Sequence, residues 1–203
     1  MDLYQKLASG AGQDEVLLKS DVPMQASDWS RDGRFILYAT NDPKTNWDLW
    51  VLPMTGDRKP IPFLQTGFSE REARFSPDAR WIAYTSDESG RDEVYVQSFP
   101  ASGGKWQIST TSGSQPQWRH DGKELFYLAP DQKLMAVAVQ AGSTFEAEVP
   151  KALFEARTPR VSGSRNYDAG AADGQRFLIN TLAAQQAAAP PITVVVNWLP
   201  PRP

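Results

Sequence analysis

Alternation of apolar and polar side chains with a period of two predicts the strands of this chain. The pattern is clearest in one run, where Trp81, Ala83 and Thr85 alternate with Ile82 and Tyr84. Such a run is typical of a strand that packs on both faces within a stack of sheets. No stretch has convincing helical periodicity over three turns. We therefore predict an all-β fold.

A tight-turn motif that contains an aspartate interrupts the strands at regular intervals. The turn aspartates Asp32, Asp78, Asp121 and Asp173 are separated by 46, 43 and 52 residues. An aspartate side chain can bind backbone amides two residues on, and the glycine that usually follows it tolerates a positive φ. Ala79 takes the place of that glycine once, which predicts either a turn without left-handed geometry or a turn under strain. A period of roughly 40–50 residues with several short strands per unit is typical of a β-propeller blade.

We expect a partial β-propeller of about four four-stranded blades, in which the chain starts and ends within a blade. The units are a partial blade at 2–20, blades at about 25–66, 72–111 and 115–156, and an incomplete last blade at 166–199. The first unit contributes only third and fourth strands, near residues 3–8 and 15–19. The strands of the other units are expected near residues 26–29, 35–40, 48–53, 60–65, 73–75, 81–86, 93–99, 105–109, 117–118, 124–129, 134–140, 151–154, 167–169, 176–181 and 192–198.

An aromatic side chain comes just before the turn of each unit, at Trp29, Phe75, Trp118 and Tyr167. We interpret these four as residues that pack between blades. Trp47 is less constrained by the repeat and can be exposed.

The amino-acid composition argues against several classes of function. The formal net charge is −3 and both signs are interspersed, so no basic surface for nucleic acid or a membrane is predicted. The absence of cysteine excludes disulfides, zinc ribbons, iron–sulfur sites and thiol nucleophiles. No apolar run approaches the roughly 18 residues of a membrane span.

The residues with candidate chemistry do not form a catalytic set. His120 is the single histidine and occupies a turn position, so we interpret it as a surface turn residue. Without a second histidine or a triad, the common nucleophilic and zinc-hydrolase schemes are excluded. The acidic loop between Asp87 and Asp92 comes nearest to a calcium site but lacks Asp-x-Asp spacing. We predict no catalytic residue, no cofactor and no metal.

Propellers bind partners through loops at one rim and through the mouth of the channel. Loops that combine both charges with an aromatic side chain suit a protein or peptide partner, although a solvated loop has the same composition. The candidate rim residues are Asp42, Lys44 and Trp47 in one loop, Glu70, Arg71 and Glu72 in a connection between blades, and Asp87, Glu88 and Arg91 in a third segment.

The run from Phe68 to Asp78, Phe-Ser-Glu-Arg-Glu-Ala-Arg-Phe-Ser-Pro-Asp, resembles the PD40 or TolB-like repeat, which is related to WD40. Residues 87–96 continue the similarity. Residues 99–109, 118–128 and 191–198 resemble the propeller at the C-terminus of bacterial eukaryotic-like serine/threonine protein kinases. The resemblance covers essentially the whole chain and implies a non-catalytic module for protein interaction or ligand sensing, placed outside the cytoplasm.

Two alternatives remain open. TolB-like propellers also accompany prolyl-oligopeptidase-type hydrolases, so the chain can be an accessory propeller whose catalytic domain is absent. Neither the kinase motifs nor a Gly-x-Ser-x-Gly elbow occurs here, since Pro116 and Gln117 follow Gly113-Ser114-Gln115. The chain can also be a truncated or engineered blade array that self-assembles. Its open edges predict ring closure by its own ends, a homo-oligomer, or further blades.

Overall fold

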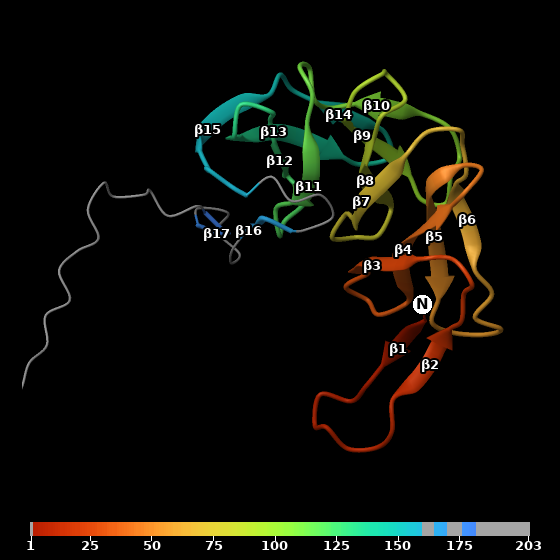
Figure 1. The fold of residues 1–203 in the computed structure, drawn as a ribbon. Coiled ribbons are helices and arrows are strands. Elements are labelled where there is room, and N and C mark those ends of the chain that lie inside the picture. Colours follow the sequence, from red (N-terminus) through yellow and green to blue (C-terminus); the bar gives the residue numbers. More distant parts are fainter. Residues whose placement is uncertain (1, 160–164, 170–175, 182–203) are drawn as a thin grey trace, which may run out of the picture.

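The computed structural model describes residues 2–159, 165–169 and 176–181, and every regular element in them is a β-strand (Figure 1). The strands are β1 (Leu3–Gln5), β2 (Glu15–Leu18), β3 (Met24–Trp29), β4 (Phe35–Asp42), β5 (Asn46–Pro53), β6 (Ile61–Leu64), β7 (Glu70–Phe75), β8 (Trp81–Ser86), β9 (Glu93–Ser98), β10 (Lys105–Gln107), β11 (Ser114–Trp118), β12 (Glu124–Leu128), β13 (Lys133–Ala141), β14 (Phe145–Ala147), β15 (Lys151–Glu155), β16 (Tyr167–Ala169) and β17 (Phe177–Ile179).

Consecutive strands pair antiparallel into separate sheets, as blades of a propeller do. The sheet β3-β4-β5-β6 and the sheet β7-β8-β9-β10 each contain four strands in chain order. The next sheet contains β11-β12-β13, and β13 then pairs with β14 near one end and with β15 near the other. The short hairpin strand β14 is absent from the sequence-based expectation. In the described residues, β1-β2 and β16-β17 form two-stranded sheets of their own.

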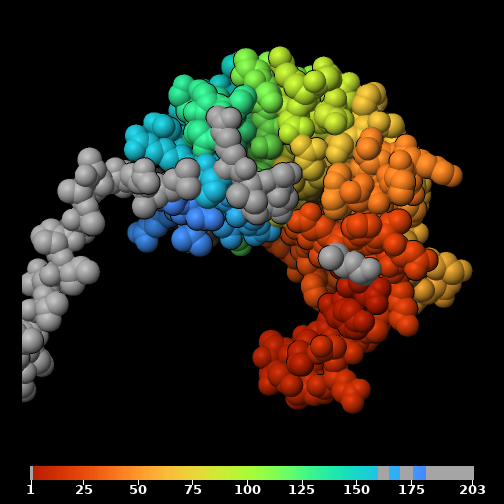
Figure 2. Space-filling model, in the orientation of Figure 1, coloured from red at the N-terminus to blue at the C-terminus, as the bar shows by residue number. Residues whose placement is uncertain are grey.

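The sheets follow one another along an arc, with β1-β2 at one end and β16-β17 at the other (Figure 1). Figure 2 shows that the surface is open between these two ends. Within the part of the chain that the structure describes, no strand pairing joins them. The described residues therefore form part of a propeller that is not closed by its own strands.

The cores lie between neighbouring sheets rather than inside one sheet. In β8, Ile82 and Tyr84 face a core shared with β4, β5 and β6. Trp81 and Ala83 of the same strand face the next core, shared with β11, β12 and β13. The period-two pattern of this strand therefore places its two sets of side chains in two different cores, which confirms packing on both faces.

The turns before the second strand of each four-stranded sheet are built on the aspartates. Asp32 accepts hydrogen bonds from the hydroxyl two residues before it (2.8 Å) and the amide two residues after it (3.0 Å). Asp78 repeats both bonds at 2.6 and 3.2 Å. Asp121 repeats the amide bond at 3.0 Å and pairs with Arg119 at 2.7 Å. Asp173 lies outside the described residues.

Ala79 adopts the left-handed backbone conformation, with φ of 56°, like Gly33 (73°) and Gly122 (74°) in the sister turns. The alternative in which this turn avoids that conformation is therefore wrong. The strain remains, but the Ala79 methyl group is buried in the core between two sheets, and that burial offsets part of its cost.

Candidate binding channel

The strands β3, β7 and β11, each the first of its sheet, line a common inner face and are tied to one another. The Phe75 amide of β7 donates to an oxygen of Asp28 in β3 (2.9 Å). The Gln115 amide of β11 donates to Glu72 of β7 (2.8 Å), and the Trp118 indole donates to a carbonyl of β7 (3.2 Å). These bonds fix the wall of the inner face, because each is made to a neighbouring sheet.

The last described inner strand, β16, is held in the same way. The Gln117 side-chain amide donates to the Tyr167 carbonyl (2.8 Å), and the Tyr167 hydroxyl donates to the Gln115 carbonyl (2.8 Å). The Asn166 amide donates to the Gln115 side chain (3.0 Å). Buried Tyr167 therefore anchors β16 against β11.

A bulge recurs in the inner strands. Glu72 in β7 and Gln115 in β11 occupy equivalent positions and have φ of 58° and 57°. The pairing register with the second strand shifts at both places. Glu72 and Arg74, two positions apart, both line the channel, as do Gln115 and Gln117.

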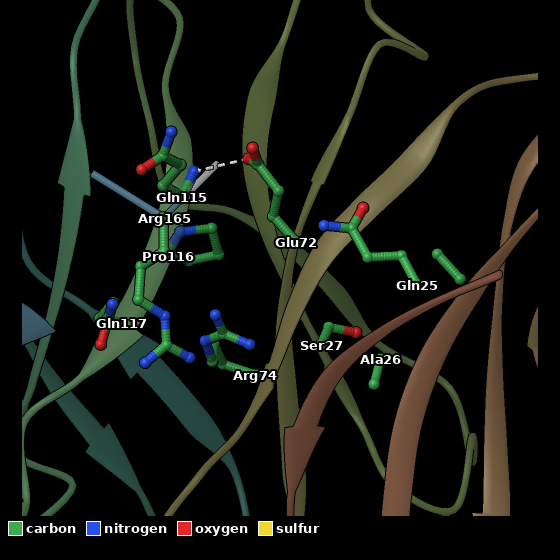
Figure 3. A pocket seen from close by; sticks show the side chains of 10 residues that line it. Gln25, Ala26, Ser27, Glu72, Arg74, Gln115, Pro116, Gln117 and Arg165 are labelled. Carbon is green, nitrogen blue, oxygen red and sulfur yellow. Dashed lines mark hydrogen bonds between the residues drawn. The ribbon is translucent and has the colours of Figure 1, made fainter. Parts of the chain in front are cut away.

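The central cavity has a volume of about 180 Å³. It is lined by Gln25, Ala26, Ser27, Ala39, Glu72, Arg74, Gln115, Pro116, Gln117 and Arg165 (Figure 3). A hollow of about 310 Å³ shares Glu72 and Gln115 with it, and one of about 220 Å³ shares Arg74, Gln117 and Arg165. The three spaces share lining residues and are therefore neighbours along the inner strands β7 and β11, and we refer to them together as the channel.

The channel holds charges that are only partly neutralised. Burial, and then the nearby Arg165, lower the pKa of the Arg74 guanidinium. Burial raises the pKa of Asp28, while Arg74 and the Phe75 amide oppose that change. Arg74 and Asp28 are therefore partly withdrawn from water, which strengthens their interactions with a charged ligand, whereas the neighbouring Arg165 is exposed.

The first candidate rim loop lies at the β4–β5 hairpin, away from the channel lining. Asp42 ends β4, Lys44 is exposed in the turn, and their contact is a 2.8 Å bond from the Lys44 amide to Asp42. Trp47 is half-buried against the core between the sheets, so it is not an exposed aromatic.

In the second candidate group, two residues line the channel and the third is buried elsewhere. Arg71 and Glu72 line the wide hollow, together with Asp92, which pairs with Arg71 at 2.6 Å. Glu70 is only 1% exposed at the start of β7, where the Thr66 hydroxyl donates to it (2.6 Å). Glu70 was expected in a connection between blades as a candidate rim residue, but it begins β7 and its side chain is buried, so it is not placed to meet a partner.

The third candidate group is engaged in contacts within the chain. Asp87 accepts a bond from the Ser69 amide (2.8 Å). Glu88 pairs with Lys105 at 2.5 Å, and Arg91 pairs with buried Glu93 at 2.6 Å. These residues stabilise the segment around the β8–β9 turn and do not line the three spaces of the channel.

His120 lines the channel at the end occupied by the aspartate turns. Its carbonyl accepts a 2.8 Å bond from Arg31, which belongs to the turn of another sheet. Among the described residues, no group of three or more histidine, cysteine, aspartate or glutamate side chains is placed to hold a metal ion. In the same residues, no helix is long and apolar enough to cross a membrane.

Sequence reasoning missed the inner-face residues Arg74, Gln115, Gln117 and Arg165. A usable signal lies immediately before the turn aromatics, where the three complete units carry polar Asp28, Arg74 and Gln117. Arg165 has no such signal, because its place depends on how β16 packs against β11.

Comparisons with known proteins agree with this architecture. The family model of the prolyl oligopeptidase N-terminal β-propeller domain matches residues 65–142. The structure of TolB from Acinetobacter baumannii matches with a TM-score of 0.57 and 20% identity, over 75% of this chain and 38% of that one. A protein assigned as TolB from Agrobacterium tumefaciens matches with a TM-score of 0.57 and 16% identity, over 73% and 56%.

A structure from a study of two prolyl endopeptidases matches with a TM-score of 0.50 and 17% identity, over 74% of this chain and 24% of that one. A search of the curated proteins found no match. The chain spans between about a quarter and slightly more than half of the length of these three structures. At these identities the likeness concerns the fold, and the described residues accordingly have a β-propeller fold similar to that of TolB.

Proposed function

We propose that this chain is a non-catalytic propeller module that binds an extended segment of a partner protein in the channel. The observation that carries the proposal is the polar channel itself, whose wall is fixed by hydrogen bonds between successive inner strands. A fixed wall lowers the entropy cost of binding, because few side chains must be ordered when the partner arrives.

The volume of the channel limits the size of the group that can enter it. Its three spaces of about 180, 220 and 310 Å³ are at or below the roughly 300–1,000 Å³ of drug-sized pockets. A folded domain cannot enter such a space, whereas one or two side chains of an extended peptide can. Arg71 and Glu72 at the wide end are the rim residues placed to meet the peptide first.

A sterically blocked variant tests this proposal. Ala26 lies on the wall of the central cavity, so Ala26→Trp fills that cavity without changing a charge. Ala147→Trp places the same side chain on the exposed strand β14 and serves as the matched control. Peptides selected from a displayed library of random 12-residue segments are then titrated against the three proteins by fluorescence anisotropy.

We expect at least a tenfold loss of affinity in Ala26→Trp and unchanged affinity in Ala147→Trp. Peptides that bind both variants equally well, or a library that yields no binder to the wild-type protein, would exclude the channel as a peptide site. Circular dichroism of both variants establishes that each remains folded.

The biological setting follows from the resemblance and is part of the proposal. In the first setting the module is the sensor part of a receptor kinase and lies outside the cytoplasm. In the second, favoured by the peptidase-propeller match over residues 65–142, it accompanies a hydrolase domain. The coding sequence next to this segment separates the two, because one requires kinase motifs and the other a nucleophile elbow.

We also propose that further blades or a second copy of the chain cover the open ends of the arc. Large apolar side chains are exposed on both terminal sheets, including Leu7 (67%) beyond β1 and Leu178 (75%) in β17. Unpaired strand edges and exposed apolar side chains favour association. Light scattering coupled to size-exclusion chromatography measures the mass, and a strictly monomeric chain at all concentrations would contradict association between copies.

A further inference from the structure

Two arginines from different strands converge in the central cavity. Arg74 comes from β7 and Arg165 precedes β16, and Figure 3 shows both guanidinium groups pointing into the same space. The nearest carboxylate recorded for Arg165 is Asp168, at 3.8 Å. Arg74 has no ion pair within 4 Å among the residues that the structure describes. Two cations therefore share one space, with Asp28 beside them and with the Arg165 side chain half-exposed.

Two buried polar atoms of the cavity wall have no hydrogen-bond partner among the described residues. They are the Arg74 Nε and the Ser27 Oγ, which belong to the neighbouring inner strands β7 and β3. A buried donor without an acceptor costs free energy. Both atoms lie just behind the surface of the cavity, so the groups that meet a ligand directly are the ends of the two guanidinium groups.

The charges that line the cavity indicate how much negative charge the ligand carries. In the central cavity, Arg74 and Arg165 contribute two positive charges and Glu72 contributes one negative charge. Asp28 and Asp168, which lie beside these arginines in the adjoining hollow, add two further negative charges. The positive charge left for a ligand is therefore small, which favours a carboxylate with one negative charge over a phosphate with two.

Building on the peptide-binding function proposed above, we propose that Arg74 and Arg165 hold a carboxylate of the bound segment. The planar guanidinium presents two parallel donors that match the two oxygens of a carboxylate. Binding of the anion between the two guanidinium groups reduces the repulsion between the arginines. The carboxylate belongs either to the C-terminus of the peptide or to an aspartate or glutamate side chain.

Three small probes distinguish these two sources. N-acetylglycine carries only a C-terminal-type carboxylate, and N-acetylglutamate α-amide carries only a side-chain carboxylate. N-acetylglutamine amide is the neutral counterpart of the second probe. Each is titrated at pH 7 and low ionic strength while the arginine ¹H–¹⁵Nε resonances are followed by NMR.

We expect a saturable shift of the Arg74 Nε resonance with at least one carboxylate probe and none with the neutral probe. Whichever carboxylate binds more tightly identifies the source. Arg165→Gln, with its half-exposed side chain, should weaken that binding at least tenfold, and Arg74→Gln should do the same. Arg80→Gln, in an exposed turn of the same sheet, should leave the affinity unchanged.

Equal shifts with the neutral probe, undiminished affinity in both channel variants, or tighter binding of inorganic phosphate would each overturn the carboxylate assignment. If no carboxylate probe binds, while library peptides still bind Ala26→Trp more weakly than Ala147→Trp, the channel binds peptides through groups other than a carboxylate. If both experiments fail, the proposed function fails as well.

Discussion

Glu70 should make the protein less stable as the pH rises toward neutrality. Its side chain is 1% exposed, one carboxylate oxygen accepts a bond from Thr66, and the other has no partner among the described residues. Burial, together with the negative charges of Asp48, Glu88 and Asp87, raises the pKa of Glu70 from 4.5 to about 7.

The direction of the effect follows from proton binding. Between pH 4.5 and about 7, the folded state keeps the Glu70 proton that the unfolded chain releases. The stabilisation is therefore complete below pH 4.5 and is lost as the pH rises through 7. A change of this size corresponds to at most about 3 kcal/mol of unfolding free energy, at about 1.4 kcal/mol for each tenfold change in proton affinity.

Glu70→Gln removes this titration and keeps an oxygen that can accept the Thr66 bond. We expect the variant to match the wild-type protein near pH 4.5 and to exceed its stability by up to about 3 kcal/mol at pH 8. Urea unfolding followed by tryptophan fluorescence across this range measures the difference. Glu146→Gln, on exposed strand β14, is the control and should show no such gain. Parallel pH dependences for wild type and Glu70→Gln would refute the reasoning.

Three further substitutions test the packing and the turns. Trp81→Ala removes a buried ring from the core between two sheets and should cost about 3–5 kcal/mol in urea unfolding; a loss below about 1 kcal/mol would contradict that packing. Gly33→Ala should cost about 1 kcal/mol in thermal unfolding, because φ is 73° and the new methyl group meets open space; an unchanged melting temperature would contradict this. The Arg119 bond, the Lys123 amide and the charges of both residues hold the pKa of Asp121 at about 2, below its usual 3.8, so its contribution is present above pH 3.8 and is lost toward pH 2. Between pH 4.5 and 2.5, the unfolding free energy of Asp121→Asn should therefore fall less than that of the wild-type protein, with a difference under about 1 kcal/mol. An equal fall in both proteins would contradict the pairing of Asp121 with Arg119.

The repeat made the fold predictable from the sequence. Both faces of β8 and the aspartate turns depend on residues close together in the chain, so local patterns contain the information. The position of Trp29 was less predictable, because it is 50% exposed although its counterparts Phe75 and Trp118 are buried. Each counterpart packs against the preceding sheet, and the sheet that precedes Trp29 has only two strands in the described residues.

The channel could not be read from the sequence in the same way. The repeat marks only the last residues of β7 and β11, so the sequence-based prediction begins these strands at residues 73 and 117, three residues too late. Glu72 and Gln115 were therefore not recognised as inner-strand residues, and Glu70 was assigned to a connection between blades. The bulges at Glu72 and Gln115 add a register shift that the repeat does not mark.

Asp28, Arg74 and Gln117 occupy equivalent positions, each immediately before a turn aromatic. Two of these side chains hold the fold together, and the third does not. The Asp28 side chain holds the next inner strand through the Phe75 amide, and the Gln117 side chain holds the next one through the Tyr167 carbonyl. Between β7 and β11 the corresponding bond uses the Arg74 carbonyl, which accepts from Trp118, so the guanidinium is not needed for that link. Replacement of Arg74 should therefore leave the connection between these sheets intact, whereas replacement of Asp28 or Gln117 removes one. At this position the backbone makes the bond between the sheets, and the charged Arg74 side chain lines the channel without taking part in that bond.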